Sequence, residues 1–402
     1  MIKVSSAERA ALCAKSGSRQ VKFRFDRVLQ NGAVIGTVDA TGSITMDISN
    51  QIMRTARFTV HNPGSLNWLS DMIKPYMLVY TGELEYPISR ELSWSMIDQS
   101  TSTWAENDAA GRTWDSIDAI RFNEGVPYPR WAEWPLGLFV LSTPTRNGDA
   151  WEVEAYDRTV VLKEDCLTEN LYIPAGEGYL DAVEAVLIGG GITSIDIRNP
   201  STATLPVGRE FEVGTSRLEV ANALLQEITY NNLYADADGR IVISKYVEPS
   251  GSQAGWTYQA DALSVIYRET SSVLDSYEVP NVIVAVCSNP NMAQSMRSVY
   301  TNDNPGSPLS TVNRGRQIVR VDTLDSVASQ ADLDAYVQRA AFEAGQIYEE
   351  IQFSTLLMPI HEYSDVLMIQ HPEISGVYQE TGWSMDLESG QMTHNCRRLV
   401  TL

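Results

Sequence analysis

Residues 216–243 read SRLEVANALLQEITYNNLYADADGRIVI, a stretch that passes from helical to strand-like spacing. Ser216 and Glu219 stand at the spacing of a capping box, in which each side chain satisfies a backbone amide of the other residue. An apolar face at helical spacing follows, formed by Leu218, Ala221, Leu225 and Ile228. Residues 234–243 then read as a strand, an Asp-Gly turn and another strand, so we expect a small α+β unit here.

A second predicted helix lies upstream and belongs to the same unit. Its apolar residues recur at helical spacing: Tyr179, Leu180, Ala182, Val183, Val186 and Leu187. The helix ends at Gly189-Gly190-Gly191, where glycine permits a left-handed cap. We therefore assign an α+β insert to residues 168–254.

The residues before this insert read as strands joined by tight turns. Val21, Phe23 and Phe25 alternate with polar residues, which is the period of a half-buried strand. Further along, residues 147–149 read Asn-Gly-Asp, a strong hairpin turn. Strands at this spacing, with turn signals between them, predict an antiparallel barrel or sandwich, which we assign to residues 17–167.

Strand patterns return after about Gly255, and residues 281–286 are the clearest core strand. A long helix is predicted at about 330–348, with one apolar face formed by Leu333, Tyr336, Val337, Ala340, Ala341, Ala344 and Ile347. Strands separated by prolines and glycines follow, so residues 255–402 are assigned to a second strand domain. The predicted fold class is mainly β with an α+β insert, with antiparallel strand domains, each a barrel or a sandwich, on both sides of the insert.

A tryptophan-rich segment interrupts the first strand domain at about residues 93–134. Polar residues surround five tryptophans in this region: Trp94, Trp104, Trp114, Trp131 and Trp134. Long insertions are uncommon inside compact domains, so we expect this one to have a contact role. Local packing of the indole rings is favoured over a cage for a ligand.

Length and composition indicate a globular protein of several domains. The chain has 402 residues, too many for one ordinary hydrophobic core, so two to four domains are expected. Hydrophobic residues make up 44% and charged residues 20%, close to globular averages, and no apolar run reaches the length of a membrane-spanning segment. Residues 1–16 lack the apolar core of a secretory signal and are predicted to form a short helical arm.

The chain is strongly acidic. Its 51 acidic and 30 basic residues give a formal net charge of −21, which argues against a surface that grips nucleic-acid phosphates. A nucleic acid that slides past without binding remains compatible with this charge. The alternative is that acidity only maintains solubility.

Cysteine spacing indicates neither a zinc site nor a disulfide framework. The four cysteines carry no C-x-x-C pair and are scattered at Cys13, Cys166, Cys287 and Cys396. We therefore expect buried thiols.

Histidine and glycine patterns predict no catalytic, metal or cofactor residue. His361 precedes Glu362, but His371 follows ten residues on, across a predicted strand and turn, which is not the spacing of a helical zinc site. A surface or packing imidazole is therefore the interpretation for each of the four histidines. The glycines at 189–191 end a helix, so they present carbonyl groups and cannot cradle a phosphate.

Acidic pairs are likewise interpreted as structural. Asp236 and Asp238 resemble the start of a calcium loop, but apolar residues follow where further oxygen ligands would be needed, so a hairpin turn explains them better. Two pairs of carboxylates could be considered for glycoside cleavage, namely Glu83 with Glu85 and Glu349 with Glu350. A solvated charged face explains such pairs more simply.

Several segments along the chain share a pattern with one known family. They are Arg54–Val60 with Trp68–Pro75, Trp151–Arg158, Arg217–Leu225 leading into Tyr234–Arg240, Asp365–Leu367 and Gly390–His394. Together they resemble the tail-tip or baseplate hub family of tailed phages, which is related to the hub beneath contractile tails and to type VI secretion spikes. The resemblance extends over nearly the whole chain.

This resemblance implies a fold and a structural role. The fold would contain two tail-tube-like β-barrel domains around the α+β insert, and a homotrimer would place six barrels in a ring that continues the tail tube. The implied partners are distal tail and tail tube proteins, the tape-measure protein, and tip spike or fibre proteins, with phage DNA passing through the channel without specific binding. The chain would be part of the virion tail and would gate DNA ejection, without enzymatic activity or a cofactor.

Two other functions are considered. A tail-associated cell-wall-degrading enzyme would need a hydrolase domain, and the chain ends shortly after its last strand pattern. A carbohydrate-binding receptor module would use Trp104, Trp114 and Trp131 to stack on sugars.

Overall fold

The computed structural model describes residues 1–14, 18–84, 128–260, 265–273, 277–287, 295–324, 326–346 and 350–398. The chain divides into two compact units. The larger contains Met1–Lys3, Arg24–Tyr76 and Pro135–Leu402, and the smaller contains Val4–Phe23 and Met77–Trp134.

The smaller unit contains the helix of the predicted arm and, among the described residues, two tryptophans of the tryptophan-rich segment, Trp131 and Trp134. Helix α1 (Ser6–Leu12) begins with a capping box between Ser5 and Glu8. The ring of Trp131 packs edge-on against Tyr80 at 5.7 Å between centroids, and the Lys22 ammonium lies 4.3 Å from the Trp131 centroid. Trp134 is buried. Both described tryptophans of this region are therefore packed against other residues of the protein.

Most of the tryptophan-rich segment lies outside the residues that the structure describes. Trp94, Trp104 and Trp114 lie outside the described residues, as do Glu85 and Glu349. Whether that segment binds a partner stays a prediction.

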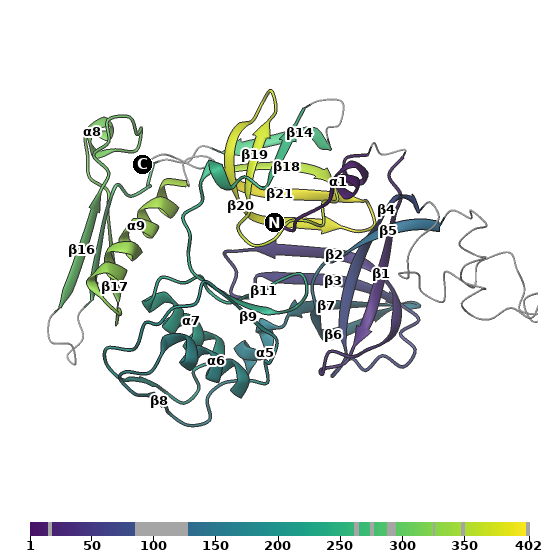
Figure 1. The fold of residues 1–402 in the computed structure, drawn as a ribbon, viewed down its shortest axis with the longest axis horizontal. Coiled ribbons are helices and arrows are strands. Elements are labelled where there is room, and N and C mark those ends of the chain that lie inside the picture. The colour runs from purple at the N-terminus through teal and green to yellow at the C-terminus, as the bar shows by residue number, and fades with distance from the viewer. Residues whose placement is uncertain are drawn as a thin grey trace, which may run out of the picture. The chain divides into compact units, whose positions relative to one another are not determined.

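Six strands form a first strand group, coloured purple to blue in Figure 1. They are β1 (Val21–Val28), β2 (Val34–Asp47), β3 (Arg54–His61), β4 (Met72–Leu84), β6 (Phe139–Asn147) and β7 (Ala150–Asp157), and β5 (Tyr128–Pro135) pairs with β4. Their pairings run β1-β4-β6-β7-β3-β2 and return from β2 to β1. Alternation of apolar and polar residues buries one face, where the rings of Phe25, Phe58 and Phe139 meet edge-on at 5.8 and 5.5 Å.

A second strand group comes from the last part of the chain. It contains β13 (Trp256–Gln259), β14 (Ile266–Val273), β18 (Glu350–Leu356), β19 (Val366–Gln370), β20 (Ser375–Asp386) and β21 (Gln391–Arg398). The order is β14-β18-β21-β20-β19-β13, antiparallel except for the parallel pair β13 and β19. Strand β2 pairs with β20 from Ser43↔Asp386 to Asp47↔Gly382, so the two strand groups share one continuous sheet.

The α+β insert lies between these strand groups in the sequence. Its elements are α5 (Thr159–Glu164), β8 (Leu171–Ile173), α6 (Tyr179–Gly189), β9 (Ile195–Arg198), β10 (Arg209–Phe211), α7 (Arg217–Glu227), β11 (Tyr234–Ala235) and β12 (Ile241–Ser244). The predicted capping box of α7 is present, and α6 ends at the triple glycine, with Gly191 at a φ of 77°. One buried core joins α6 and α7 to β12, so the prediction of an α+β insert is confirmed.

A three-stranded sheet and a long helix form a further layer. The strands are β15 (Val282–Cys287), β16 (Met296–Thr301) and β17 (Val319–Leu324), accompanied by α8 (Thr311–Arg314) and α9 (Gln330–Gln346). The short 3₁₀ turn η1 (Gly251–Gln253) lies instead beside Val377 of β20 in the second strand group. Helix α9 packs its predicted apolar face, including Leu333 and Val337, on β15, and it lies beside β16 and β17 of the same sheet in Figure 1. This sheet is separate from the second strand group, and β15 is its central strand.

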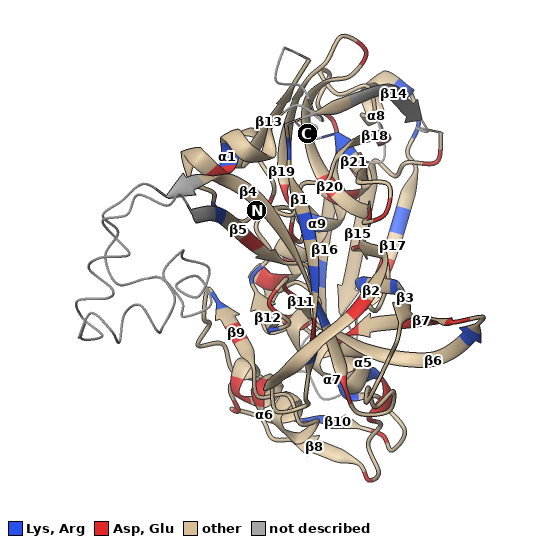
Figure 2. Cartoon of the chain, turned by 90° about the vertical axis from the view of Figure 1, so that its right-hand side faces the viewer, with Lys and Arg blue, Asp and Glu red and all other residues tan. Residues whose placement is uncertain are grey.

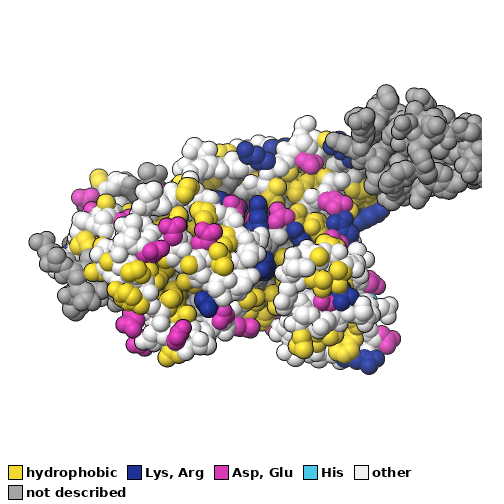
Figure 3. Space-filling view, turned by 60° about the horizontal axis from the view of Figure 1, so that its bottom comes forward, with side chains coloured by type: hydrophobic (Ala, Val, Ile, Leu, Met, Phe, Trp, Pro, Cys, Tyr) yellow, Lys and Arg dark blue, Asp and Glu magenta, His cyan; other side chains and the backbone are white. Residues whose placement is uncertain are grey.

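Charged residues are spread over the molecule. Figure 2 shows acidic and basic residues on the insert and on both strand groups, and on the face displayed in Figure 3 they are interspersed with apolar side chains. Among the described helices, none has the length and apolar character needed to cross a membrane.

The cysteine prediction is correct only in part. Cys287 and Cys396 are buried, and Cys13 is half-buried. Cys166 is exposed, so the expectation of a buried thiol is wrong there. It follows α5 in an extended turn that forms an isolated bridge with Ser216, and its side chain faces solvent.

Candidate functional site

Three residues of the second strand group form a buried polar cluster. His361 lies in the loop between β18 and β19, Glu380 lies in β20, and His394 lies in β21. Each is at most 1% exposed. The antiparallel ladder β19-β20-β21 brings these residues together, although they are far apart in the sequence. We call this group the His-Glu-His cluster.

Strand geometry explains why these polar side chains point inward. In β21 the side chains alternate, so that Met392, His394 and Cys396 are buried and the residues between them face outward. In β20 the register shifts between Glu380 and Gly382, a β-bulge that lets Glu380 pair with Cys396. The carboxylate is therefore directed into the core.

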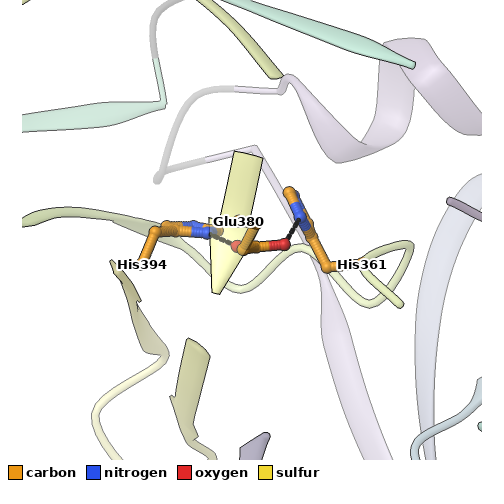
Figure 4. Close-up of side chains that lie close together, drawn as sticks. All are labelled: His361, Glu380 and His394. Atoms are coloured by element: carbon orange, nitrogen blue, oxygen red, sulfur yellow. Dashed lines mark hydrogen bonds and ion pairs between the residues drawn. The ribbon is translucent and has the colours of Figure 1, made fainter. Parts of the chain in front are cut away.

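The carboxylate of Glu380 bridges the two imidazole rings (Figure 4). Its Oε2 lies 2.7 Å from Nδ1 of His361, and its Oε1 lies 2.6 Å from Nδ1 of His394. These are short hydrogen-bond distances, as expected when charge or a shared proton is involved.

The outer nitrogen of each ring also has a partner. Nε2 of His361 lies 2.7 Å from the Tyr258 hydroxyl, and Nε2 of His394 lies 2.8 Å from Oγ1 of Thr355. The ring of Phe353 stacks on His394 at 4.6 Å and 11°. All four ring nitrogens are therefore satisfied, as buried polar groups require.

Burial moves the pKa values of the cluster in opposite directions. It lowers the pKa of His361 to about 4 and also lowers that of His394, because a buried imidazolium loses its hydration. Burial raises the pKa of Glu380 to about 7, against the opposing hydrogen bond from His394. The interior therefore disfavours separate charges on these groups.

The same three residues are the candidates for a metal site among the described residues, since their ligand atoms lie within 4.8 Å of one another. A zinc ion would need Nδ1 of both rings at about 2.0–2.1 Å, with the carboxylate beside it. In this structure the carboxylate stands between the rings at hydrogen-bond distance from both nitrogens. The arrangement therefore suits a shared proton better than a cation.

The cluster is closed to substrates. Its members have no more than 1% exposure, so no substrate can reach the imidazoles or the carboxylate without a conformational change. What the arrangement can do chemically is hold and exchange protons inside the core of the second strand group.

Asp236 and Asp238, which the sequence also offered as candidates, have structural roles. Asp236 accepts hydrogen bonds from the backbone and side chain of Arg240, at 2.9 Å each, in the β11–β12 turn. Asp238 pairs with Lys74 at 3.2 Å. The hairpin interpretation is therefore confirmed, because both carboxylates are used within the protein.

Of the other two histidines, neither joins the cluster. His371 is half-buried beside Glu373, and His61 is exposed. His361 and His394 are packed in the core. Sequence reasoning did not single out Glu380 or His394. The sequence signal for His394 is its place in an alternating strand, in which every second residue is buried and His394 is one of the buried ones.

A polar cleft of about 810 Å³ lies beside β18 and α9. Two ion pairs line this cleft: Arg339 contacts Glu343 at 2.8 Å, and Arg397 contacts Glu350 at 2.9 Å. Glu350 is therefore part of a surface ion pair, as expected for a solvated charged face.

Comparisons with known proteins identify the fold. No family model matches the sequence, and no curated protein matches it significantly. The structure is similar to a tail protein from Neisseria meningitidis MC58, with a TM-score of 0.57 and 10% identity, over 94% of this chain and 96% of that one. It is also similar to the 43 kDa tail protein of prophage MuSo2 from Shewanella oneidensis, with a TM-score of 0.52 and 7% identity, over 93% of this chain and 98% of that one. Over nearly its whole length, the chain has the fold of these two tail proteins.

Proposed function

We propose that the chain is a structural subunit at the distal end of a phage-type tail, where it forms a hub that continues the tail tube. The observation that carries this proposal is the fold shared with two tail proteins over 93–94% of the chain. Because the shared fold covers nearly complete chains, both strand groups and the insert take part in the likeness.

The sheet arrangement supports a wall-forming role. Two strand groups joined through β2 and β20 give a continuous hydrogen-bonded surface, and the first group's pairings return on themselves. In a homotrimer, three copies would contribute six such groups to one ring. The division into an arm at 1–16, strand domains at 17–167 and 255–402, and an insert at 168–254 is part of this proposal.

The proposed partners follow from this position. The strand groups would contact tail tube proteins, and the insert would contact tip spike or fibre proteins. The ring would also hold the end of a tape-measure protein and open for DNA. A net charge of −21 suits passage of DNA without binding, because acidic side chains repel phosphates.

A structural role without catalysis is the accompanying proposal. The His-Glu-His cluster is closed to substrates, and the carboxylates considered for glycoside cleavage include Glu350, which is paired with Arg397. Release of muropeptides from purified cell wall by the chain would instead support the cell-wall-degrading enzyme.

Two measurements test the hub proposal together. Light scattering of the purified chain should give three times its mass of 44.6 kDa. Immunogold labelling of particles that contain the chain should mark one end of the tail. A monomer at all concentrations, combined with label along the whole tail or on the capsid, would contradict the proposal.

A further inference from the structure

The loop His361–Asp365, between β18 and β19, contacts three parts of the larger unit. His361 enters the core of the second strand group and bonds to Glu380. Glu362 turns the other way, and its Oε2 accepts a hydrogen bond at 3.0 Å from the guanidinium of Arg54 in β3. Its Oε1 accepts a second bond at 3.0 Å from the backbone amide of Ala237 in the insert.

The next residues of the loop strengthen these connections. The ring of Tyr363 stacks on Tyr234 of the insert, with centroids 4.3 Å apart and an angle of 14°. The carboxylate of Asp365 accepts a hydrogen bond from the backbone amide of Glu362 at 2.8 Å, and it also contacts the Met1 ammonium. Adjacent residues of one short loop thus bond to both strand groups and to the insert.

Hydrogen-bond counting fixes the number of protons in the His-Glu-His cluster. The Thr355 hydroxyl donates its one proton to the carbonyl of Leu356 at 2.7 Å, so its Oγ1 accepts from Nε2 of His394. His394 therefore carries a proton on Nε2. One further proton then lies between its Nδ1 and Glu380, on either side of a 2.6 Å hydrogen bond.

Burial keeps His361 neutral, because it lowers the pKa of the ring to about 4. In the tautomer whose Nδ1 donates to Oε2 of Glu380, Nε2 accepts the hydroxyl proton of Tyr258. With one proton shared between Glu380 and His394, the cluster has no net charge. A proton added to His361 would create a positive charge that the carboxylate, already matched by His394, cannot balance.

Other charged or titratable groups face the cluster from each element around it. They are Tyr258 of β13, Asp365 of the loop, Cys396 of β21, and the Met1 ammonium, whereas Glu362 of the loop points away from the cluster. The carboxylates of Glu362 and Asp365 are engaged by Arg54 and Met1 respectively. No uncommitted carboxylate among these groups is placed to neutralise a protonated His361.

We propose that the loop His361–Asp365 is a proton-controlled latch. The latch is closed while His361 is neutral and one proton is shared between Glu380 and His394. It is released from Arg54, Ala237 and Tyr234 when the ring of His361 takes up a second proton of its own. Release lets the imidazolium of His361 reach water. Because Glu362 directly follows His361, the same movement breaks the contacts with β3 and with the insert. The latch acts within the chain and does not depend on the proposed role in a tail.

Amide hydrogen exchange of the full chain tests the latch. The amides of Ala237 and Glu362 report on it directly, since each donates to a side chain of the loop. The pKa of His361 is about 4 in the closed loop and would be 6.5 in the open loop, so protonation favours opening as the pH falls. The protection of both amides from exchange should therefore fall about thirtyfold between pH 7.5 and pH 5, after correction for intrinsic rates. Amides of β15 should keep their protection, and unchanged protection at Ala237 would overturn the proposal.

Matched variants assign the effect to His361. In His361→Asn the side chain keeps a donor for Glu380 and cannot be protonated, so Ala237 should stay protected at pH 5. His371→Asn removes a histidine of the same strand group outside the cluster and should behave like the unchanged protein. An equal loss of protection in both variants would overturn the latch.

A measurement on the unchanged protein covers the case in which His361→Asn does not fold. Exchange of the imidazole C2 proton, followed by mass spectrometry, gives the titration of each histidine separately. His361 should titrate at the same midpoint at which Ala237 loses protection. Protonation of His361 with Ala237 still protected would show that the loop does not open and would overturn the proposal.

Discussion

Arg54 and Glu362 are 308 residues apart in the sequence, yet the guanidinium of one donates a hydrogen bond to the carboxylate of the other at 3.0 Å. The Arg54 side chain is 1% exposed and lies over the ring of Trp383. Burial raises the pKa of Glu362, and the Arg54 charge opposes that shift. Each charge of this pair therefore depends on the other to remain in the interior.

Removal of Arg54 alone should destabilise the protein more than removal of both charges. Arg54→Met leaves Glu362 buried without a counter-charge, which typically costs about 3–5 kcal/mol. Adding Glu362→Gln removes that charge and keeps an acceptor for the Ala237 amide, so the double variant should unfold at a higher temperature than Arg54→Met. Calorimetric melting temperatures check this order. A double variant that melts at or below Arg54→Met would contradict the coupling.

Thermal stability should vary little with pH, because two contributions oppose each other. The folded-state pKa of His361 is lowered to about 4 from 6.5, so its contribution is present above pH 6.5 and is lost as pH falls toward 4. The folded-state pKa of Glu380 is raised to about 7 from 4.5, so its contribution is present below pH 4.5 and is lost as pH rises from 4.5 through 7. The two changes nearly cancel between these pH values, so melting temperatures measured from pH 4.5 to pH 9 should form a nearly level profile.

Glu380→Gln should remove the Glu380 contribution and uncover that of His361. A glutamine amide can accept from His361 through its oxygen and donate to His394 through its nitrogen, which reproduces the hydrogen bonds of the protonated acid. The melting temperature of the variant should therefore fall as pH falls from 6.5 toward 4.5, whereas that of the unchanged protein stays nearly level. A variant profile as level as that of the unchanged protein would contradict the opposing contribution of Glu380.

Zinc should not stabilise the protein. Because the Glu380 carboxylate separates the two imidazoles at hydrogen-bond distance, an ion would have to displace both bonds. A tenfold molar excess of zinc should leave the melting temperature unchanged, with His394→Ala as the comparison. A zinc-dependent rise that disappears in His394→Ala would show a metal centre in place of a shared proton.

Two glycines of β2 should respond differently to the same substitution. Gly42 and Gly36 have similar φ values of 146° and 152°, in a region that favours glycine. A methyl group on Gly42 would meet the carbonyl oxygen of Arg57 at 2.0 Å, whereas none of the atoms described lies within 4 Å of one on Gly36. Gly42→Ala should therefore lower the melting temperature far more than Gly36→Ala. Equal effects would mean that backbone strain, rather than the contact with β3, dominates.

Local signals in the sequence were sufficient to predict where several helices and strands begin or end. The capping box of Ser216 and Glu219 begins α7, the triple glycine ends α6, and the Asn-Gly-Asp turn joins β6 to β7. Each of these signals acts between residues close in the chain, so the sequence contains the whole interaction. Helix α9 was equally clear, since its apolar face spans several turns.

The buried cluster depends on relationships that the sequence pattern does not contain. Glu380 points inward because of the bulge between Glu380 and Gly382. A bulge shifts the alternation of inward and outward side chains by one residue, and strand predictions depend on that alternation. His361 lies in a loop, where no periodicity marks burial. The apolar run 282–286 likewise predicts a core strand without specifying which sheet contains it, and β15 forms a sheet separate from the second strand group.

The pairing of β2 with β20 limits how this protein can be divided into pieces. A chain cut after the insert would leave Ser43–Asp47 of β2 without its neighbouring strand, and Ile44 and Met46, both buried in the intact chain, would become accessible. An unpaired strand edge with apolar side chains recruits other chains. The first strand group produced alone would therefore tend to aggregate or to exchange strands between copies, and each half needs the other to remain in solution.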